Sequence, residues 1–557
     1  GPTVGRMGLL ATEGVYTNTS GYSGRHTDFL DPEMVGDEFV LPEFVLPGIR
    51  QFRHPDVGRQ PHEQPPWPEN PSVWDRMGRW FLVFAAAALR SSSWSVAGFQ
   101  TTPSFASFPS TRAISPFSRR SFYTNLEMNK ALARPGAAKE GAARIAVIGG
   151  GISGLVCARR LKELGLSPVV FDTGKKAVGG RVSSRVLQIE GAGKGGVSVD
   201  HSTQFLTATE PRFEQLLSEL AKEGAVKAWE GPVGELQAGA FTPMDSKQTR
   251  WVGVGGIASI PKALAAPLDI RLDTWVASVE RQEGGAWRLF LDAQKRRPLS
   301  SATTKGVQED FEYICVAHNG KCAERLMREA DVPALHKLLK CKFGSGPPPK
   351  ALMQLSSLWV CCFAVKGSLG LPFEGAFVKG SQDLCWVADN SKKMAGAGAA
   401  AEGYEAWTLV STRPYGTANK VPQENVPKDV ADRVTREMTR AFETAAGLAP
   451  GTIAPVASRV QLWGAGVPMN TYTPAPCILD AAKAAGICGD WLVDPSVQGA
   501  AISGIEMADA IKAHLDGKKE NVGILDSLDG AFRAVDSPAC GSFPGLPLKD
   551  ATPPVFV

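Results

Sequence analysis

The chain has 557 residues, of which 43% are hydrophobic, and a formal net charge of +4. This length suggests roughly three or four domain-sized units, and the composition is ordinary for a soluble globular protein. So small a net charge predicts no nucleic-acid partner. No apolar run reaches the roughly eighteen residues that a membrane span needs, so no span is expected in the mature protein.

Ten cysteines and seven histidines are scattered along the chain. No Cys-x-x-Cys pair occurs, and the histidines do not cluster with cysteines or acids at ligand spacing. The sequence therefore predicts no metal site. Buried free thiols in a reducing compartment are expected instead.

Three segments precede the first pattern typical of a strand or helix, and each resembles a targeting sequence or a spacer. Residues 1–76 begin with Gly1-Pro2, are rich in Pro, Gly and charge, and are expected to be disordered or non-native sequence. Residues 77–98 follow the order of a signal peptide, and residues 99–140 have the Ser-rich, basic composition of a transit peptide. This pair resembles the bipartite presequence of algae with secondary plastids and implies delivery to the plastid stroma. The alternative is a mitochondrion, and a fluorescent fusion of residues 77–140 tests both.

The first nucleotide motif begins with a β-branched run at residues 144–148, followed by Gly149-Gly-Gly151-Ile152-Ser153-Gly154 and a helical pattern. Gly149 permits a tight turn, Gly151 lets the backbone approach a pyrophosphate, and Gly154 lets the helix pack closely on the strand. The helix start stabilises an anion through free N–H groups. Asp172 ends the next strand, where it can accept hydrogen bonds from ribose hydroxyls. The motif fits either NAD or FAD.

Gly179-Gly180-Arg181 follows soon after Asp172. It resembles the Gly-Gly-Arg signature of flavin amine oxidases. In that family the glycines pack against the dinucleotide and the arginine lies beside it, which implies the same for Gly180 and Arg181.

A second motif lies near the other end of the chain. A short strand ends in Gly489-Asp490, and Gln498-Gly499-Ala500 opens an apolar helix. An aspartate here can accept from a ribityl hydroxyl, and the helix start can stabilise negative charge on a reduced flavin. The segment resembles the C-terminal FAD motif of glutathione-reductase-type flavoproteins. Two such motifs in one chain predict FAD as the cofactor, since an NAD dehydrogenase needs only the first.

The segments between the motifs resemble renalase-like FAD/NAD(P)-binding oxidoreductases, in particular a plant and algal plastid branch. The resemblance rests on Asp200-His201-Ser-Thr-Gln204-Phe205, on Trp251-Val-Gly-Val-Gly-Gly256 and on several later segments, and covers residues 143–515. It implies that Gln204 and Phe205 lie near the flavin and that the backbone of Val276 contacts adenine. It also implies dihydronicotinamides, NAD(P)H among them, as candidate substrates.

Some features depart from the wider family. Amine oxidases place a lysine on a substrate-domain strand, but the comparable residues 355–362 contain none. This lowers the expectation of ordinary amine oxidation. His201 is expected mainly as a packing residue that could also touch the cofactor. Five tryptophans could together form an aromatic cage over the flavin, although each alone is more typical of a core: Trp251, Trp359, Trp386, Trp407 and Trp463.

The expected fold class is α/β, with a Rossmann-like doubly wound FAD domain and a discontinuous mixed or antiparallel α+β substrate domain. The folded body spans residues 141–515. Its FAD domain is expected at about 141–203, 251–322 and 456–515, and its substrate domain at about 204–250 and 323–455. Residues 516–557 turn polar and Pro/Gly-rich, which predicts a disordered tail.

The predicted function is that of an FAD-dependent oxidoreductase that moves a hydride from a small planar or amine-like molecule to flavin N5. The sequence identifies no catalytic residue and makes no prediction of oligomeric state. Two alternatives stay open: a carotenoid-type desaturase or isomerase, and a non-catalytic flavin-binding assembly or regulatory protein.

Overall fold

The computed structural model describes residues 141–190, 196–245, 248–292, 307–318, 321–344, 352–395 and 403–535. The disordered segment, signal peptide and transit peptide expected at 1–76, 77–98 and 99–140 lie outside these residues. Among the helices of the described part, none is both long and apolar enough to cross a membrane.

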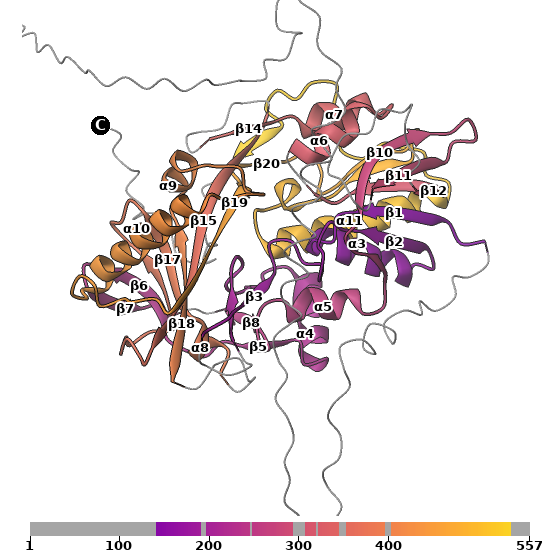
Figure 1. Cartoon of the computed structure of the whole chain (residues 1–557). Coiled ribbons are helices and arrows are strands. Elements are labelled where there is room, and N and C mark those ends of the chain that lie inside the picture. Colours follow the sequence, from indigo (N-terminus) through magenta and orange to yellow (C-terminus); the bar gives the residue numbers. More distant parts are fainter. Residues whose placement is uncertain are drawn as a thin grey trace, which may run out of the picture. The chain divides into compact units, whose positions relative to one another are not determined.

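A six-stranded sheet in the order β21-β22-β13-β1-β2-β9 carries the two nucleotide motifs (Figure 1). The strands from β22 to β9 pair in parallel, and only β21 runs antiparallel to its neighbour. The largely parallel sheet expected from the sequence is therefore confirmed. Its strands are β1 (Arg144–Ile148), β2 (Ser167–Phe171), β9 (Asp269–Arg271), β13 (Tyr313–Val316), β21 (Ile478–Asp480) and β22 (Ala485–Ile487).

Alternating side chains of β1 enter two different cores. Ile145 and Val147 pack towards helices α3 (Ile152–Glu163) and α11 (Val497–Leu515). Ala146 and Ile148 belong to the core on the opposite face. That face is covered by an antiparallel sheet, β10 (Trp275–Arg281), β11 (Trp287–Asp292) and β12 (Val307–Phe311), and by α6 (Lys321–Arg328) and α7 (Pro333–Leu339). A strand buried on both faces explains the continuous apolar run in the sequence.

A second, eight-stranded sheet has the order β14-β15-β18-β17-β16-β6-β7, with β19 paired to β15. Its long strand β15 sends Trp359, Cys361 and Phe363 towards helix α10 (Lys428–Ala446), which covers that face (Figure 1). Leu358 and Val360 point to the other face. The remaining bounds are β6 (Val233–Gln237), β7 (Ala240–Pro243), β14 (Cys341–Phe343), β15 (Met353–Lys366), β16 (Gly375–Val378), β17 (Leu384–Asp389), β18 (Tyr404–Ser411) and β19 (Ala457–Pro468). Parallel and antiparallel pairs both occur, so the expected mixed sheet is confirmed.

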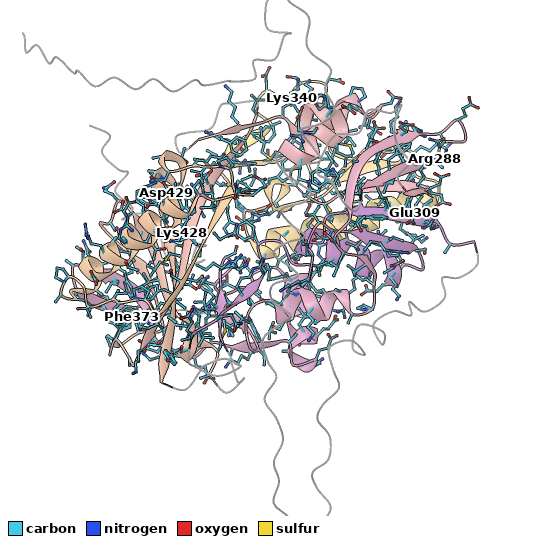
Figure 2. The ribbon with its side chains drawn as sticks, viewed as in Figure 1. Arg288, Glu309, Lys340, Phe373, Lys428 and Asp429 are labelled. Carbon is cyan, nitrogen blue, oxygen red and sulfur yellow. The ribbon has the colours of Figure 1, made fainter. Side chains whose placement is uncertain are left out.

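The remaining elements are β3 (Ser184–Leu187), β4 (Val197–Asp200), α4 (Pro211–Lys222), β5 (Val226–Ala228), β8 (Trp251–Gly253), α5 (Ser259–Ala265), α8 (Asn390–Lys393), α9 (Arg413–Ala418), β20 (Asn470–Tyr472), a 3₁₀ turn (Asp490–Leu492) and β23 (Phe532–Ala534). Figure 2 places Arg288 on the three-stranded sheet and Lys428 at the start of α10.

The expected domain boundaries need correction at three places. Strand β19 belongs to the eight-stranded sheet, so the chain returns to the nucleotide domain near residue 469 and not near 456. Helices α6 and α7 pack into the core of the nucleotide domain. Helix α4 also packs there, because Phe213 and Leu217 join the cluster that contains Ile152 of α3. Apolar faces of these helices, which the strand pattern does not reveal, decide the boundaries.

The predicted disordered tail is wrong for residues 516–535. Strand β23 pairs with β20, and Phe532 stacks on Trp491 with ring centroids 6.4 Å apart. Leu528 and Ala531 are buried beside them. A few apolar side chains in a polar segment are enough to dock it on the core. Residues 536–557 lie outside the described part.

Candidate functional site

A cavity of about 1000 Å³ is lined by both nucleotide motifs and by one face of the eight-stranded sheet. Its volume lies at the upper end of the roughly 300–1000 Å³ of typical ligand pockets. Of the residues expected at a cofactor site, the lining contains Gly149, Gly151, Ile152, Ser153, Asp172, Gly180, Arg181, Gln204, Phe205, Val276, Asp490, Gln498 and Ala500. Gly154, Gly489 and Gly499 are absent from it, and each has a packing or backbone role instead.

The turn between β1 and α3 is built by glycines for two separate reasons. Gly149 has φ +119°, which side-chain-bearing residues rarely adopt. A Cβ on Gly154 would lie 2.0 Å from the carbonyl oxygen of Gly149, so this glycine lets the helix start close to the strand. Gly151 is the N-cap of α3 and no side chain caps the helix. Free N–H groups at this end therefore face the cavity and can bind an anion.

The carboxylate of Asp172 holds this turn by accepting hydrogen bonds from two backbone N–H groups. One oxygen accepts from the Gly150 N–H at 2.7 Å and the other from the Gly174 N–H at 2.7 Å. Each carboxylate oxygen can accept a second hydrogen bond. Asp172 also lines the cavity, so it holds the turn and still offers acceptors to a ligand hydroxyl.

Arg181 joins the two motifs across the cavity. Its guanidinium donates to Asp490 Oδ2 at 2.7 Å and to the Gly466 carbonyl at 2.8 Å. Asp490 is almost fully buried, and this ion pair balances its charge. Gly180, directly before the arginine, has φ +54° and lies against the backbone of Gly151.

The second motif forms the start of α11. Ser496 caps the helix by accepting from the Gly499 N–H at 3.0 Å. A Cβ on Gly499 would lie 2.1 Å from the Asp494 carbonyl, so this glycine permits the tight loop before the helix. The Gln498 side chain accepts from the N–H groups of Thr209 and Glu210, and so fixes the segment that leads into α4. The Gly489 N–H donates to the Ser503 hydroxyl at 2.9 Å.

Gln204 lines the cavity, but its side-chain carboxamide forms its hydrogen bonds with buried groups of the protein. The amide group donates to the carbonyls of Asp200 and Ser202 at 2.9 and 2.8 Å. Its oxygen lies 3.4 Å from Lys393 Nζ. Lys393 in turn pairs with Asp200 Oδ2 at 2.9 Å, and both side chains are buried, at 0% and 1% exposure. The residue pattern gave no signal for this ion pair, because Lys393 and Asp200 are far apart in the chain.

The side of the cavity opposite the nucleotide motifs contains residues that sequence reasoning missed. Leu358, Val360 and Val410 form an apolar wall, and the loop from Lys420 to Glu424 adds polar groups. Lys420 Nζ lies 3.4 Å from the centroid of the Phe343 ring. Alternation along residues 355–362 could have identified this wall, since alternate side chains of a strand point to the same face and Leu358 and Val360 line the cavity.

The five tryptophans do not together form the aromatic cage that the sequence allowed, and three of them take the core positions expected of each alone. Trp359, Trp386 and Trp407 are fully buried in the second domain. Of the five tryptophans considered, only Trp463 is among the described residues that line the cavity. Buried tryptophans fill the large volume between sheet and helix, where their apolar area is most stabilising.

His201 lies behind Trp463 and not in the cavity lining. The two rings stack with centroids 5.5 Å apart, and Trp463 Nε1 donates to the His201 carbonyl at 3.1 Å. Burial, together with the nearby charge of Arg185, lowers the pKa of His201 to about 3. The imidazole is therefore neutral at neutral pH and acts as a support for Trp463.

Comparison with known proteins agrees with the fold of the first motif. The family model of the NAD(P)-binding Rossmann-like domain matches residues 147–220. Among solved structures, the chain is similar to a triple mutant of putrescine oxidase, with 13% identity over 67% of this chain and 99% of that chain and a TM-score of 0.45. It is also similar to reduced UDP-galactopyranose mutase, with 11% identity over 69% of this chain and 98% of that chain and a TM-score of 0.47. A third similar structure is cyclohexylamine oxidase from Brevibacterium oxydans, with 13% identity over 67% of this chain and 100% of that chain and a TM-score of 0.46.

Proposed function

We propose that this chain binds FAD and is an oxidoreductase acting on a small planar or amine-like molecule, with dihydronicotinamides such as NAD(P)H as one candidate class. The observation that carries the proposal is a single cavity lined by two nucleotide motifs on one side and an apolar wall on the other. A dinucleotide cofactor and a small apolar substrate portion need these two kinds of surface together.

The residues present fit FAD. The uncapped start of α3 offers N–H groups for a pyrophosphate, and Asp172 offers acceptors for ribose hydroxyls. A carboxylate at this position would repel a 2′-phosphate. Val276 lines the cavity, as the resemblance to renalase-like proteins implies for adenine contact. Asp490 and the start of α11 are suited to the ribityl and ring portions.

Bound FAD supplies the hydride acceptor, so the protein itself need not supply a redox group. Leu358, Val360 and Val410 exclude water from the substrate side. Trp463 offers a flat surface there, and His201 holds its ring in place. Asp490 is paired with Arg181, and the imidazole of His201 is neutral. Leu358, Val360, Val410 and Trp463 therefore orient a substrate and desolvate its reacting atoms.

The test begins with the visible spectrum of the purified full chain. We expect flavin absorbance and release of FAD on heating. Anaerobic protein is then mixed with NADH and its ring isomers, NADPH, polyamines, aromatic amines and carotenoid precursors, and the flavin absorbance is followed. Bleaching within seconds by one class identifies the substrate class and the first half of the reaction.

The outcomes separate the alternatives. A colourless protein that takes up no FAD contradicts the proposal as a whole. Tight FAD without bleaching by any compound supports the non-catalytic flavin-binding alternative. Bleaching by carotenoid precursors alone would assign the desaturase or isomerase class.

A further inference from the structure

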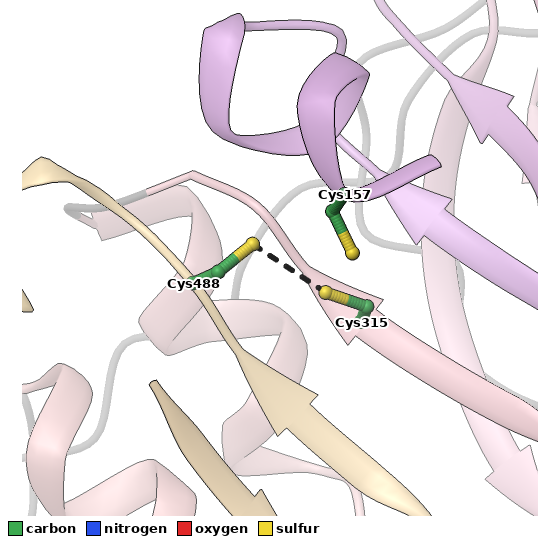
Figure 3. A group of neighbouring side chains, drawn as sticks. All are labelled: Cys157, Cys315 and Cys488. Atoms are coloured by element: carbon green, nitrogen blue, oxygen red, sulfur yellow. Dashed lines mark hydrogen bonds between the residues drawn. The ribbon is translucent and has the colours of Figure 1, made fainter. Parts of the chain in front are cut away.

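Three cysteines from distant parts of the sequence meet beneath the nucleotide motifs (Figure 3). Cys157 lies on α3, Cys315 on β13 and Cys488 directly after β22. Their sulfur atoms all lie within 4.8 Å of one another, and the Cys315 and Cys488 sulfurs are 3.6 Å apart. All three side chains are completely buried. The fold thus gathers three soft ligand atoms at one point.

This spacing matches a metal bound by three sulfurs. A bond of about 2.3 Å from metal to sulfur places three sulfurs of a trigonal plane roughly 4.0 Å apart. One separation is 3.6 Å and none exceeds 4.8 Å, so small side-chain rotations would complete the geometry. Three thiols that only filled space would need no such convergence, since each alone behaves as a small hydrophobic group.

The number and kind of ligand atoms indicate which metal ion fits the site. In the described part of the chain, no further histidine, cysteine or carboxylate ligand atom lies within 4.8 Å of all three sulfurs. Structural zinc uses four ligands in a tetrahedron, whereas thiolates favour Cu(I) among the soft ions. We propose that Cys157, Cys315 and Cys488 form a binding site for Cu(I). An apolar surrounding that excludes water also protects this ion from oxidation.

The ion would enter from the cavity, at Ser153. Ser153 lines the cavity, and its hydroxyl lies beside the Cys488 thiol. Apart from this contact, the Ser153 hydroxyl has no hydrogen-bond partner among the described residues. One side chain therefore separates the thiols from the cavity, and a metal site needs such a path.

The site also connects the two nucleotide motifs. Cys157 belongs to the helix that starts at the first motif, and Cys488 precedes Gly489 and Asp490 of the second. A bound ion would tie these segments together. Each neutral thiol that becomes a thiolate ligand releases one proton to solvent, and no electron transfer is involved.

The experiment loads the reduced full chain with one equivalent of Cu(I) under anaerobic conditions and challenges it with excess bathocuproine disulfonate, a chromophoric Cu(I) chelator. We expect one copper per chain to resist the chelator, and native mass spectrometry to show the same mass increase. Cys157→Ala, Cys315→Ala and Cys488→Ala should each weaken copper binding by more than about tenfold, which is the loss that even outer-shell changes cause.

Cys361→Ala is the matched control, because this cysteine is equally buried but lies on β15 in the other domain. It should retain the copper. X-ray absorption of the wild-type complex tests the site without any variant, and we expect three sulfur ligands at about 2.3 Å. The proposal is overturned if the chelator removes all copper from the wild type, or if the copper has fewer than three sulfur ligands. It is also overturned if a variant that carries all three cysteine-to-alanine changes retains as much copper as the wild type.

Discussion

Asp172 shows how one side chain serves both the fold and a ligand. Its two oxygens accept from the N–H groups of Gly150 and Gly174, which shape the turn beside the cavity. It also lines the cavity at the end of β2. This half-buried carboxylate matters to the fold, because two backbone donors would otherwise lose their partner.

Asp172→Ala should therefore weaken FAD binding more than it weakens the fold. Hydrogen bonds to charged groups contribute about 1.5–3 kcal/mol, which corresponds to a dissociation constant higher by roughly 10- to 100-fold. Titration of the apoprotein with FAD, followed by flavin fluorescence, measures this change. Asp310→Ala is the control, since this carboxylate pairs with Arg288 on the outer sheet (Figure 2). Equal affinity of Asp172→Ala and wild type would place the ribose acceptor elsewhere.

The crossing of α3 and α11 positions the starts of both helices at the cavity. The helices approach most closely at Gly504, where a Cβ would lie 2.4 Å from the Ser153 carbonyl and 3.0 Å from the Cys157 nitrogen. Both neighbouring atoms belong to backbone, so they cannot turn aside as a flexible side chain would. A glycine in mid-helix is otherwise unfavourable, which makes this contact its physical reason.

Gly504→Ala should destabilise the protein. Alanine gains about 1 kcal/mol of helix propensity over glycine, whereas overpacking costs roughly 1–3 kcal/mol. A contact as short as 2.4 Å to backbone places the cost at the upper end, so the net change is a loss. Urea unfolding measures it. Gly284→Ala, where a Cβ meets no atom within 4 Å, should unfold like the wild type. A Gly504→Ala protein as stable as wild type would show that the helices can shift apart freely.

A buried ion pair joins the nucleotide side to the eight-stranded sheet. Asp200 accepts from the Ile257 N–H at 2.8 Å and pairs with Lys393 at 2.9 Å, while its carbonyl accepts from the Thr408 hydroxyl at 2.9 Å. Lys393 also lies near both oxygens of Gln204. The cavity wall around Gln204 therefore depends on a contact between two parts of the molecule.

Lys393→Met should cost about 3–5 kcal/mol of unfolding free energy, because it leaves the buried Asp200 carboxylate without its counter-ion. Chemical denaturation of the full chain gives the value. Lys428→Met provides the comparison, since this lysine is 88% exposed in its pair with Asp432 and should change nothing measurable (Figure 2). A small loss for Lys393→Met would mean that water or another cation compensates Asp200.

The sequence by itself determined the features that rest on short-range rules. Gly149 to Asp172 form a strand, turn, helix and strand within one stretch, so spacing and glycine conformation predict them. The parallel sheet and the second mixed sheet follow from the same patterns. The approximate place of most candidate cofactor residues also follows, because the ends of parallel strands meet at one edge.

Only the tertiary structure decided which distant residues meet. The Lys393–Asp200 pair, the three thiols around Cys488 and the docking of Phe532 on Trp491 all join segments that no local pattern connects. The tryptophans expected over a flavin lie mostly in the core for the same reason, since composition does not say which face of a strand a side chain takes. Long-range packing selects these partners by burying complementary apolar and charged surfaces, and a periodicity read along one segment carries no information about the other.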